Sequence, residues 1–274
     1  MKQTNPINIV LDVPLITQKC ASRILRTIVE VSMFQRNQIP FVYEIFCGQI
    51  TKWDSPTENT ASDDDASVPK MRSMHLTKQR TKARETLTST QVLFDTVDKI
   101  ITEHSTVREV MILFGKTIYT AKEAIIVNLP SINTNHVGQN HRNGMSQNLR
   151  EIAKTLSLSN EIFDNMQVKD TTNMFVLCKP LLIPQVSGNG IFPVDEFQLP
   201  SKCIQFVINL NTSELVPATA VFEIFDEDPE APKVSKTGTE PTAPPLETAN
   251  KWYQLDVVVK GFKLIRRKGC HIWE

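Results

Sequence analysis

The residues with the clearest potential for chemistry are a tripeptide that resembles a phosphate loop and two neighbouring histidines. The sequence GKT at residues 115–117 matches the end of a phosphate-binding loop, but Val110 stands where that loop requires its first glycine. We therefore predict a hairpin turn there. His136 and His141 lie in a loop rich in glycine and asparagine, with no cysteine or carboxylate nearby to complete a zinc set. We expect no metal and no cofactor.

Other catalytic motifs are missing from the sequence. It contains no Gly-x-Ser-x-Gly, His-Glu-x-x-His or Cys-x-x-Cys. The five cysteines are far apart, at Cys20, Cys47, Cys178, Cys203 and Cys270. Such a scattered, odd set, together with an N-terminus that does not resemble a signal peptide, is typical of reduced intracellular thiols. The expectation is an intracellular protein that is not an enzyme and works by holding other proteins.

The charge and hydropathy of the chain limit the classes of partner that we expect. Thirty basic and thirty acidic residues cancel in a chain of 274 residues, which argues against a protein that lies along nucleic acid. No run of about eighteen apolar residues occurs, so no membrane partner is expected. One segment has an excess of basic residues, since no acidic residue lies between Asp65 and Glu85. The basic residues of that run are Lys70, Arg72, Lys78, Arg80, Lys82 and Arg84. They are either the solvated face of a helix or a docking patch for an acidic surface or nucleic acid.

The elements that position these residues can be read from hydrophobic periodicity. We predict helices over 17–37 and 71–104 and a third that starts near Ser146. Predicted strands cover Ile7–Val13, Val110–Phe114, Ile118–Leu129, Met174–Cys178, Cys203–Leu210, Ala220–Phe225 and Trp252–Val259. Mobile loops are predicted at about 51–70, 131–145 and 226–250. These elements indicate one α+β domain over 1–274, with three helices on a mixed sheet.

Two features favour partner binding. The helical stripe through Cys20, Ile24, Ile28 and Val31 continues to Gln35, a polar residue at an apolar position. A buried amide without a hydrogen bond costs about 1–3 kcal/mol. Gln35 therefore either fastens the core or a loop, or it is exposed and meets a partner.

The second feature is the tail strand at 251–262, which follows the polar segment 226–250. It either docks on a distant edge of the domain as an added strand or is simply the last strand of the sheet.

Three segments together resemble the comet family, whose members bind the spindle-checkpoint protein named mitotic-arrest-deficient two. They are FQRNQIPFVYE (34–44), VMILFGKTIYTAKEAIIVNL (110–129) and WYQLDVVVKGF (252–262). The resemblance implies a HORMA-like fold, with three helices packed on a mixed, mostly antiparallel sheet and a C-terminal safety-belt region. It also implies an adaptor that binds the closed conformer of the checkpoint protein and presents it to a hexameric AAA+ remodelling ATPase.

The cellular role implied by the resemblance is disassembly of the mitotic checkpoint complex and silencing of the checkpoint. The implied protein is a monomer alone and a heterodimer with its target. Its expected locations are the nucleus and the cytoplasm, with the kinetochore or spindle in mitosis. The alternative is a HORMA scaffold that captures short peptides under its own safety belt.

The resemblance also assigns residues to roles. Gln35 matches a glutamine that the family uses at the target interface, and an aromatic anchor of the family falls at Ala153 here. The anchor could shift to Ile152 or Leu156. Neighbours on the same helix that could complete the contact are Arg150, Lys154 and Ser157.

Two further sets of residues are implied. For docking of the ATPase, Pro193 matches the family's Pro-Lys pair and Val194 replaces its lysine. The tail would close the domain in cis through the strand residues Trp252, Tyr253, Val257 and Val259.

Overall fold

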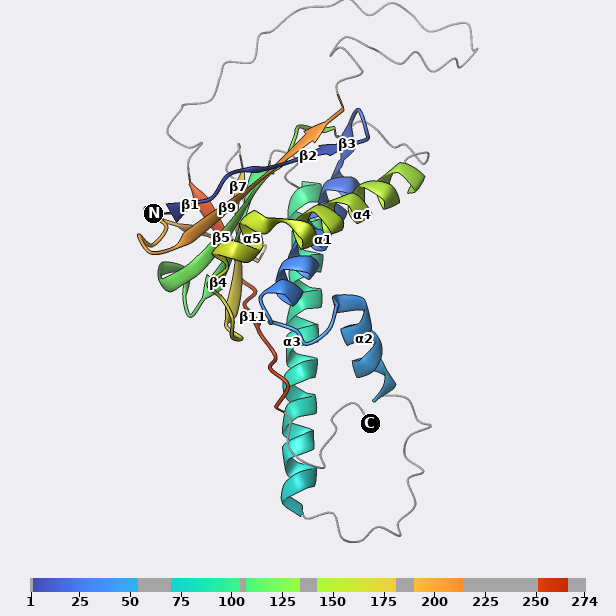
Figure 1. Cartoon of the computed structure of the whole chain (residues 1–274), viewed down its shortest axis with the longest axis vertical. Helices are drawn as coiled ribbons and strands as arrows, with labels where there is room; N and C mark the ends of the chain where they lie inside the picture. Colours follow the sequence, from blue (N-terminus) through green and yellow to red (C-terminus); the bar gives the residue numbers. More distant parts are fainter. Residues whose placement is uncertain are drawn as a thin grey trace, which may run out of the picture.

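The computed structural model describes residues 2–53, 70–103, 107–133, 142–180, 190–213 and 251–265. It shows an α+β arrangement in which a mixed, mostly antiparallel sheet packs on helices (Figure 1). The helices in the described part are α1 (Gln18–Gln35), α2 (Tyr43–Lys52), α3 (Lys70–Glu103), α4 (Arg142–Leu158), α5 (Asn160–Asn165) and a 3-10 turn, η2 (Ile118–Thr120).

Helix α1 begins and ends where local chemistry dictates. Thr17 caps its first turn by accepting a hydrogen bond from the Cys20 backbone N–H at 3.3 Å. After Arg36 the chain enters the left-handed region at Asn37, where φ is 52°, and asparagine tolerates that conformation well. The helix therefore ends before Pro40, close to the predicted end.

The strands join into one large sheet and one small ribbon. The large sheet contains β1 (Lys2–Gln3), β2 (Ile7–Leu11), β4 (Val107–Gly115), β5 (Ala121–Asn128), β7 (Asn173–Pro180), β8 (Ile191–Val194), β9 (Ile204–Thr212), β10 (Trp252–Leu255) and β11 (Val259–Lys260). Its main order is β1-β9-β5-β4-β7-β10-β8, with β2 on β9 and β11 on β7. The ribbon pairs β3 (Ile16–Thr17) with β6 (Ile132–Asn133).

Parallel and antiparallel pairs divide the sheet. β1, β2 and β5 all run parallel to β9, whereas β4, β7, β10 and β8 are joined by antiparallel ladders. Three asparagines in register cross the parallel part, where Asn128 donates to Asn209 at 2.7 Å and Asn209 donates to Asn8 at 2.8 Å. The amide ladder holds these three strands in register.

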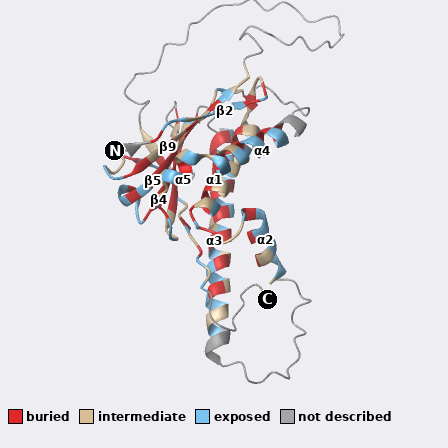
Figure 2. Cartoon of the chain, viewed as in Figure 1, coloured by how far each residue is buried: buried red, intermediate tan, exposed pale blue. Residues whose placement is uncertain are grey.

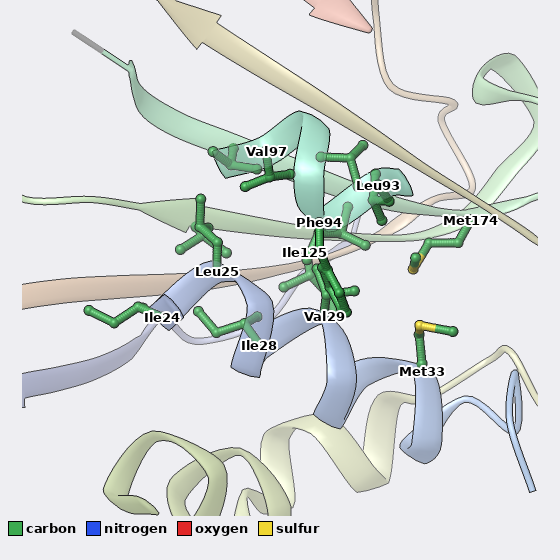
Figure 3. Packing of buried hydrophobic residues seen from close by; sticks show 14 of the residues in the cluster. Ile24, Leu25, Ile28, Val29, Met33, Leu93, Phe94, Val97, Ile125 and Met174 are labelled. Atoms are coloured by element: carbon green, nitrogen blue, oxygen red, sulfur yellow. The ribbon is translucent and has the colours of Figure 1, made fainter. Parts of the chain in front are cut away.

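The apolar run at 110–114 is buried on both faces of the sheet. Val110, Ile112 and Phe114 face the main core between sheet and helices, and Met111 and Leu113 face a second cluster on the other side. Buried residues gather where α1 and the nearer part of α3 meet the sheet (Figure 2). In Figure 3 Leu25 and Val29 lie on the side of α1 that faces Phe94 and Val97 of α3, and Met33 lies opposite Met174 of β7.

The structure corrects several predicted boundaries. Helices α2 and α5 were not predicted, residues 51–52 and 142–145 are helical rather than loop, and Ile118–Thr120 form η2 rather than the start of a strand. The hairpin of β4 and β5 is confirmed, but its turn covers 116–120, because Gly115 still belongs to β4 and pairs with Ala121. The predicted strand at 220–225, the two loop histidines and most of the predicted mobile loops lie outside the described residues.

Candidate functional site

Gln35 is held from both ends of its amide. Its Nε2 donates to the carbonyl oxygen of Leu156 at 2.8 Å, and its Oε1 accepts from Nη1 of Arg36 at 2.8 Å. The side chain is half-buried. The sequence left open whether Gln35 fastens the protein internally or is exposed to a partner. In this conformation it fastens the protein, because its amide ties the end of α1 to the end of α4. A partner would meet an amide that is already positioned.

The α4 residues expected at a partner surface divide into two sets. Ile152 and Leu156 are 0% and 1% exposed and belong to the main core. In this conformation neither side chain can therefore replace the family's aromatic anchor at the partner surface. Ala153 is half-buried. The exposed set is Arg150, Lys154 and Ser157. Lys154 lies 3.8 Å from Glu151 in a solvent-exposed pair, which holds the side chain only weakly.

Two exposed apolar side chains flank this contact and were not predicted. Phe34 precedes Gln35 at the end of α1 and is 43% exposed, and Leu158 ends α4 and is 69% exposed. Because Gln35 bonds the backbone of Leu156, the ends of the two helices that carry them are joined. Single exposed apolar residues are common on protein surfaces, so these two are interface candidates only because they lie close to Gln35 and Leu156 in the chain. In the sequence, this candidate surface could have been recognised from the aromatic Phe34 directly before Gln35.

Beneath the helix ends lies a buried ion pair that sequence reasoning missed. The side chains of Arg36 and Glu123 are both fully buried, and the Arg36 Nε donates to the Glu123 Oε2 at 3.0 Å. The guanidinium also lies 5.3 Å from the ring centroid of Phe206. Burial lowers the pKa of Arg36, and Glu123 opposes that shift.

Glu123 also organises backbone. Its Oε1 accepts hydrogen bonds from the backbone N–H groups of Gln167 and Val168, which lie after α5. The carboxylate therefore joins β5, the end of α1 and the 167–168 segment. A glutamate inside the apolar run of β5 was the signal that could have revealed it, since a buried charge needs such partners.

Gln38 connects the same corner to the C-terminal tail. Its backbone oxygen accepts from the N–H of Phe262 at 2.7 Å, and its side-chain Oε1 accepts from the N–H of Thr172 at 2.8 Å. Gln38 is only 1% exposed. The loop after α1 thus contacts both the beginning of β7 and the tail.

The tail is built into the sheet. β10 lies between β7 and β8, with Tyr253 opposite Cys178 on one side and Pro193 on the other. Tyr253 and Val259 are buried, whereas Trp252 and Val257 are half-buried. The tail then passes along α3, where the hydroxyl of Thr86 donates to the Lys260 carbonyl at 2.8 Å.

Beyond β11 the tail is fastened by a buried aromatic and by two polar contacts, from Gln79 Nε2 to the Ile265 carbonyl at 3.1 Å and from Lys263 to Asp170 at 2.7 Å. Phe262 is 3% exposed and its ring lies 6.1 Å from that of Phe46 in α2. In Figure 1 the tail runs beside α3 below the sheet. The predicted tail strand is therefore an integral part of the fold, and the sequence had left open whether it was an ordinary last strand.

The residues predicted for ATPase docking lie next to the tail. Pro193 is exposed and Val194 is buried in β8, and they stand opposite Tyr253 and Trp252 of β10. The structure therefore brings together two sets that the sequence analysis had treated separately. Only Pro193 of this pair presents its side chain to solvent.

Neither a family model nor a curated protein matches this chain.

The described residues hold neither a cluster of metal ligands nor a membrane-spanning helix. Within them, no three His, Cys, Asp or Glu side chains are grouped so that they could hold a metal ion. No helix in the described ranges has the length and apolar character needed to cross a membrane.

Proposed function

We propose that this protein is a comet-like adaptor with a HORMA-type fold. In this role it binds the closed conformer of the HORMA spindle-checkpoint protein and presents it to a hexameric AAA+ remodelling ATPase, so that the mitotic checkpoint complex is disassembled. The observation that carries the proposal is β10, a C-terminal strand held between β7 and β8 of its own chain. A domain closed on its own tail uses its outer surface for partners, and for this reason we favour the adaptor over peptide capture.

The proposed contact with the checkpoint protein is the joined end of α1 and α4. Gln35 is held by Leu156 and Arg36, and this pre-organisation lowers the entropy lost on binding. Phe34 and Leu158 offer exposed apolar area around it. The small side chain of Ala153 leaves the anchor role to these two residues. Exposed polar neighbours on α4 are Arg150, Lys154 and Ser157.

The proposed contact with the ATPase is the β8 edge of the sheet. Among the described residues β8 pairs only with β10, so no described strand lies at its other edge. Pro193 in this edge strand lacks an N–H group and so disfavours pairing with a further strand. We therefore favour a side-chain contact through Pro193 over strand addition. Since Val194 is buried, the lysine of the family's pair has no exposed substitute at this position.

Calorimetric titration against the checkpoint protein, once locked closed and once held open, tests the proposal. We expect binding to the closed form only. Leu158→Asp should weaken it at least tenfold, because it places an unpaired charge in the apolar part of the contact. Phe163→Asp is the matched control, since Phe163 is 51% exposed in the neighbouring helix α5 and is not assigned to the contact. Absence of binding to either form, or equal binding to both, would remove the adaptor function.

A further inference from the structure

A cavity of about 700 Å³ opens on the sheet end where β5 and β9 begin. Three segments that are far apart in sequence line it: the start of β5, the segment after α5 and the turn before β9. Each contributes one lysine, namely Lys122, Lys169 and Lys202. Residues 120–122 of this lining belong to one of the segments that carry the resemblance, but the resemblance assigns a role to none of the lining residues.

The lining of the cavity carries a net positive charge. It contains no carboxylate, and none of the three lysines forms an ion pair with a described residue. Two acids neighbour the lining. Glu123 is buried against Arg36. The exposed Asp170 accepts a hydrogen bond from Lys263 at 2.7 Å, which lowers the pKa of its carboxyl, and Lys122 also contributes to lowering that pKa, so Asp170 offsets the positive charge in part. Three lysines around a concave site, with one exposed acid beside them, leave a positive excess that attracts anionic ligands.

The backbone that carries the lysines is fixed. Glu123, next to Lys122, accepts the N–H groups of Gln167 and Val168, so the segment that leads to Lys169 is fastened to β5. The turn that carries Lys202 is closed by a hydrogen bond from the Cys203 N–H to the Pro200 oxygen at 2.9 Å. The backbone positions of the three lysines are therefore fixed, while their exposed side chains stay flexible and can adapt to a ligand.

From this arrangement we infer that the cavity binds an acidic peptide segment of a partner protein, one that carries two or three carboxylates. Three separate ammonium groups around an open cavity match several spaced charges better than one compact anion, which proteins usually hold with an arginine fork or a nest of N–H groups. Ala121, Met166 and Pro200 add apolar surface to the lining, suited to the CH₂ stems of glutamate side chains. The inference is independent of the adaptor function.

Fluorescence anisotropy with a labelled, C-terminally amidated peptide that carries three carboxylates, Gly-Glu-Glu-Met-Glu-Gly, tests the inference at low salt. The variant Lys122→Gln/Lys169→Gln/Lys202→Gln should bind about tenfold more weakly than the parent, because three exposed charge contacts are lost together. The matched control is Lys19→Gln/Lys52→Gln/Lys116→Gln, which removes the same net charge from exposed lysines outside both the cavity and the basic run at 70–84, and it should bind within twofold of the parent. Circular dichroism melting of both variants checks that they are folded.

Further arms separate the alternatives. A peptide with glutamine in place of glutamate should not bind, and binding should weaken as salt rises. Three outcomes would overturn the inference: no binding to the parent, an equal loss in both lysine variants, or unchanged binding in the cavity variant. Inorganic phosphate that displaces the peptide beyond the effect of chloride at equal ionic strength would reassign the cavity to small anions. Tighter binding of a single-stranded DNA oligonucleotide through the same lysines would reassign it to nucleic acid.

Discussion

Removing the carboxylate of Glu123 should destabilise the fold more than any exposed charge substitution. In Glu123→Ala the buried Arg36 guanidinium loses its counter-ion, and the N–H groups of Gln167 and Val168 lose their acceptor. Breaking a buried ion pair from one side costs about 3–5 kcal/mol. Domains of ordinary stability have about 5–15 kcal/mol in total, so we expect a loss of about a fifth of that stability or more.

Urea denaturation at neutral pH measures this loss through the midpoint and the slope of the transition. The matched control is Glu109→Ala on the neighbouring strand β4. Glu109 lies 3.5 Å from Lys179, but both side chains are more than one-fifth exposed, so the control should cost less than about 1 kcal/mol.

A double-mutant cycle with Arg36→Met tests whether the loss of stability in Glu123→Ala comes from the buried ion pair. The double variant Arg36→Met/Glu123→Ala should be less destabilised than the two single variants added together, by about 1–3 kcal/mol, because no buried charge is then left unpaired. If Glu123→Ala costs no more than Glu109→Ala, or if the two single losses are simply additive, the buried pair does not anchor the fold and the prediction is refuted.

Two further predictions concern the tail and a buried thiol. Phe262→Ala should cost about 3–5 kcal/mol, because it empties the space against Phe46, and an unchanged melting temperature would contradict the docking of the tail. Burial raises the pKa of Cys178 to about 12, so its thiol stays neutral in the folded protein while the unfolded chain loses that proton above about pH 9. Stability should therefore fall as pH rises from about 9 to about 12, and Cys178→Val should make this fall shallower by up to about 1.4 kcal/mol per pH unit, measured by urea denaturation. Parallel pH profiles for the parent and the variant would contradict it.

The long helices could be predicted because their apolar periodicity is regular over many residues, and the central hairpin because a continuous apolar run is followed by a glycine turn and a second apolar segment. α2 was missed although Tyr43, Phe46 and Ile50 fall at helical spacing. The segment closely follows Pro40 and contains Gly48, and both residues favour the prediction of a loop. β8 was missed because four residues that include Pro193 are too few to show alternation.

Pairing between distant strands left no signal in a single sequence. The parallel neighbours of β9 are chosen by packing and by ladders such as that of Asn8, Asn209 and Asn128, whose members are far apart along the chain. The same limit applies to the candidate sites. Gln35 stood out as a polar residue on an apolar stripe, whereas the partners of Arg36 and the three lysines of the cavity meet only after folding.

The pairing of β2 with β9 has a consequence for how the chain is made. Ile7 leaves the ribosome early, but its partner Ile208 emerges only after most of the protein has been synthesised. Until then β2 and the outer edge of β5 have no strand beside them, and an unpaired edge favours aggregation. The nascent chain can form the local β4–β5 hairpin early, while closure of the sheet waits for β9 and finally β10. A newly made chain of this protein would thus depend on chaperones after the β4–β5 hairpin has formed and until β9 and β10 have been synthesised.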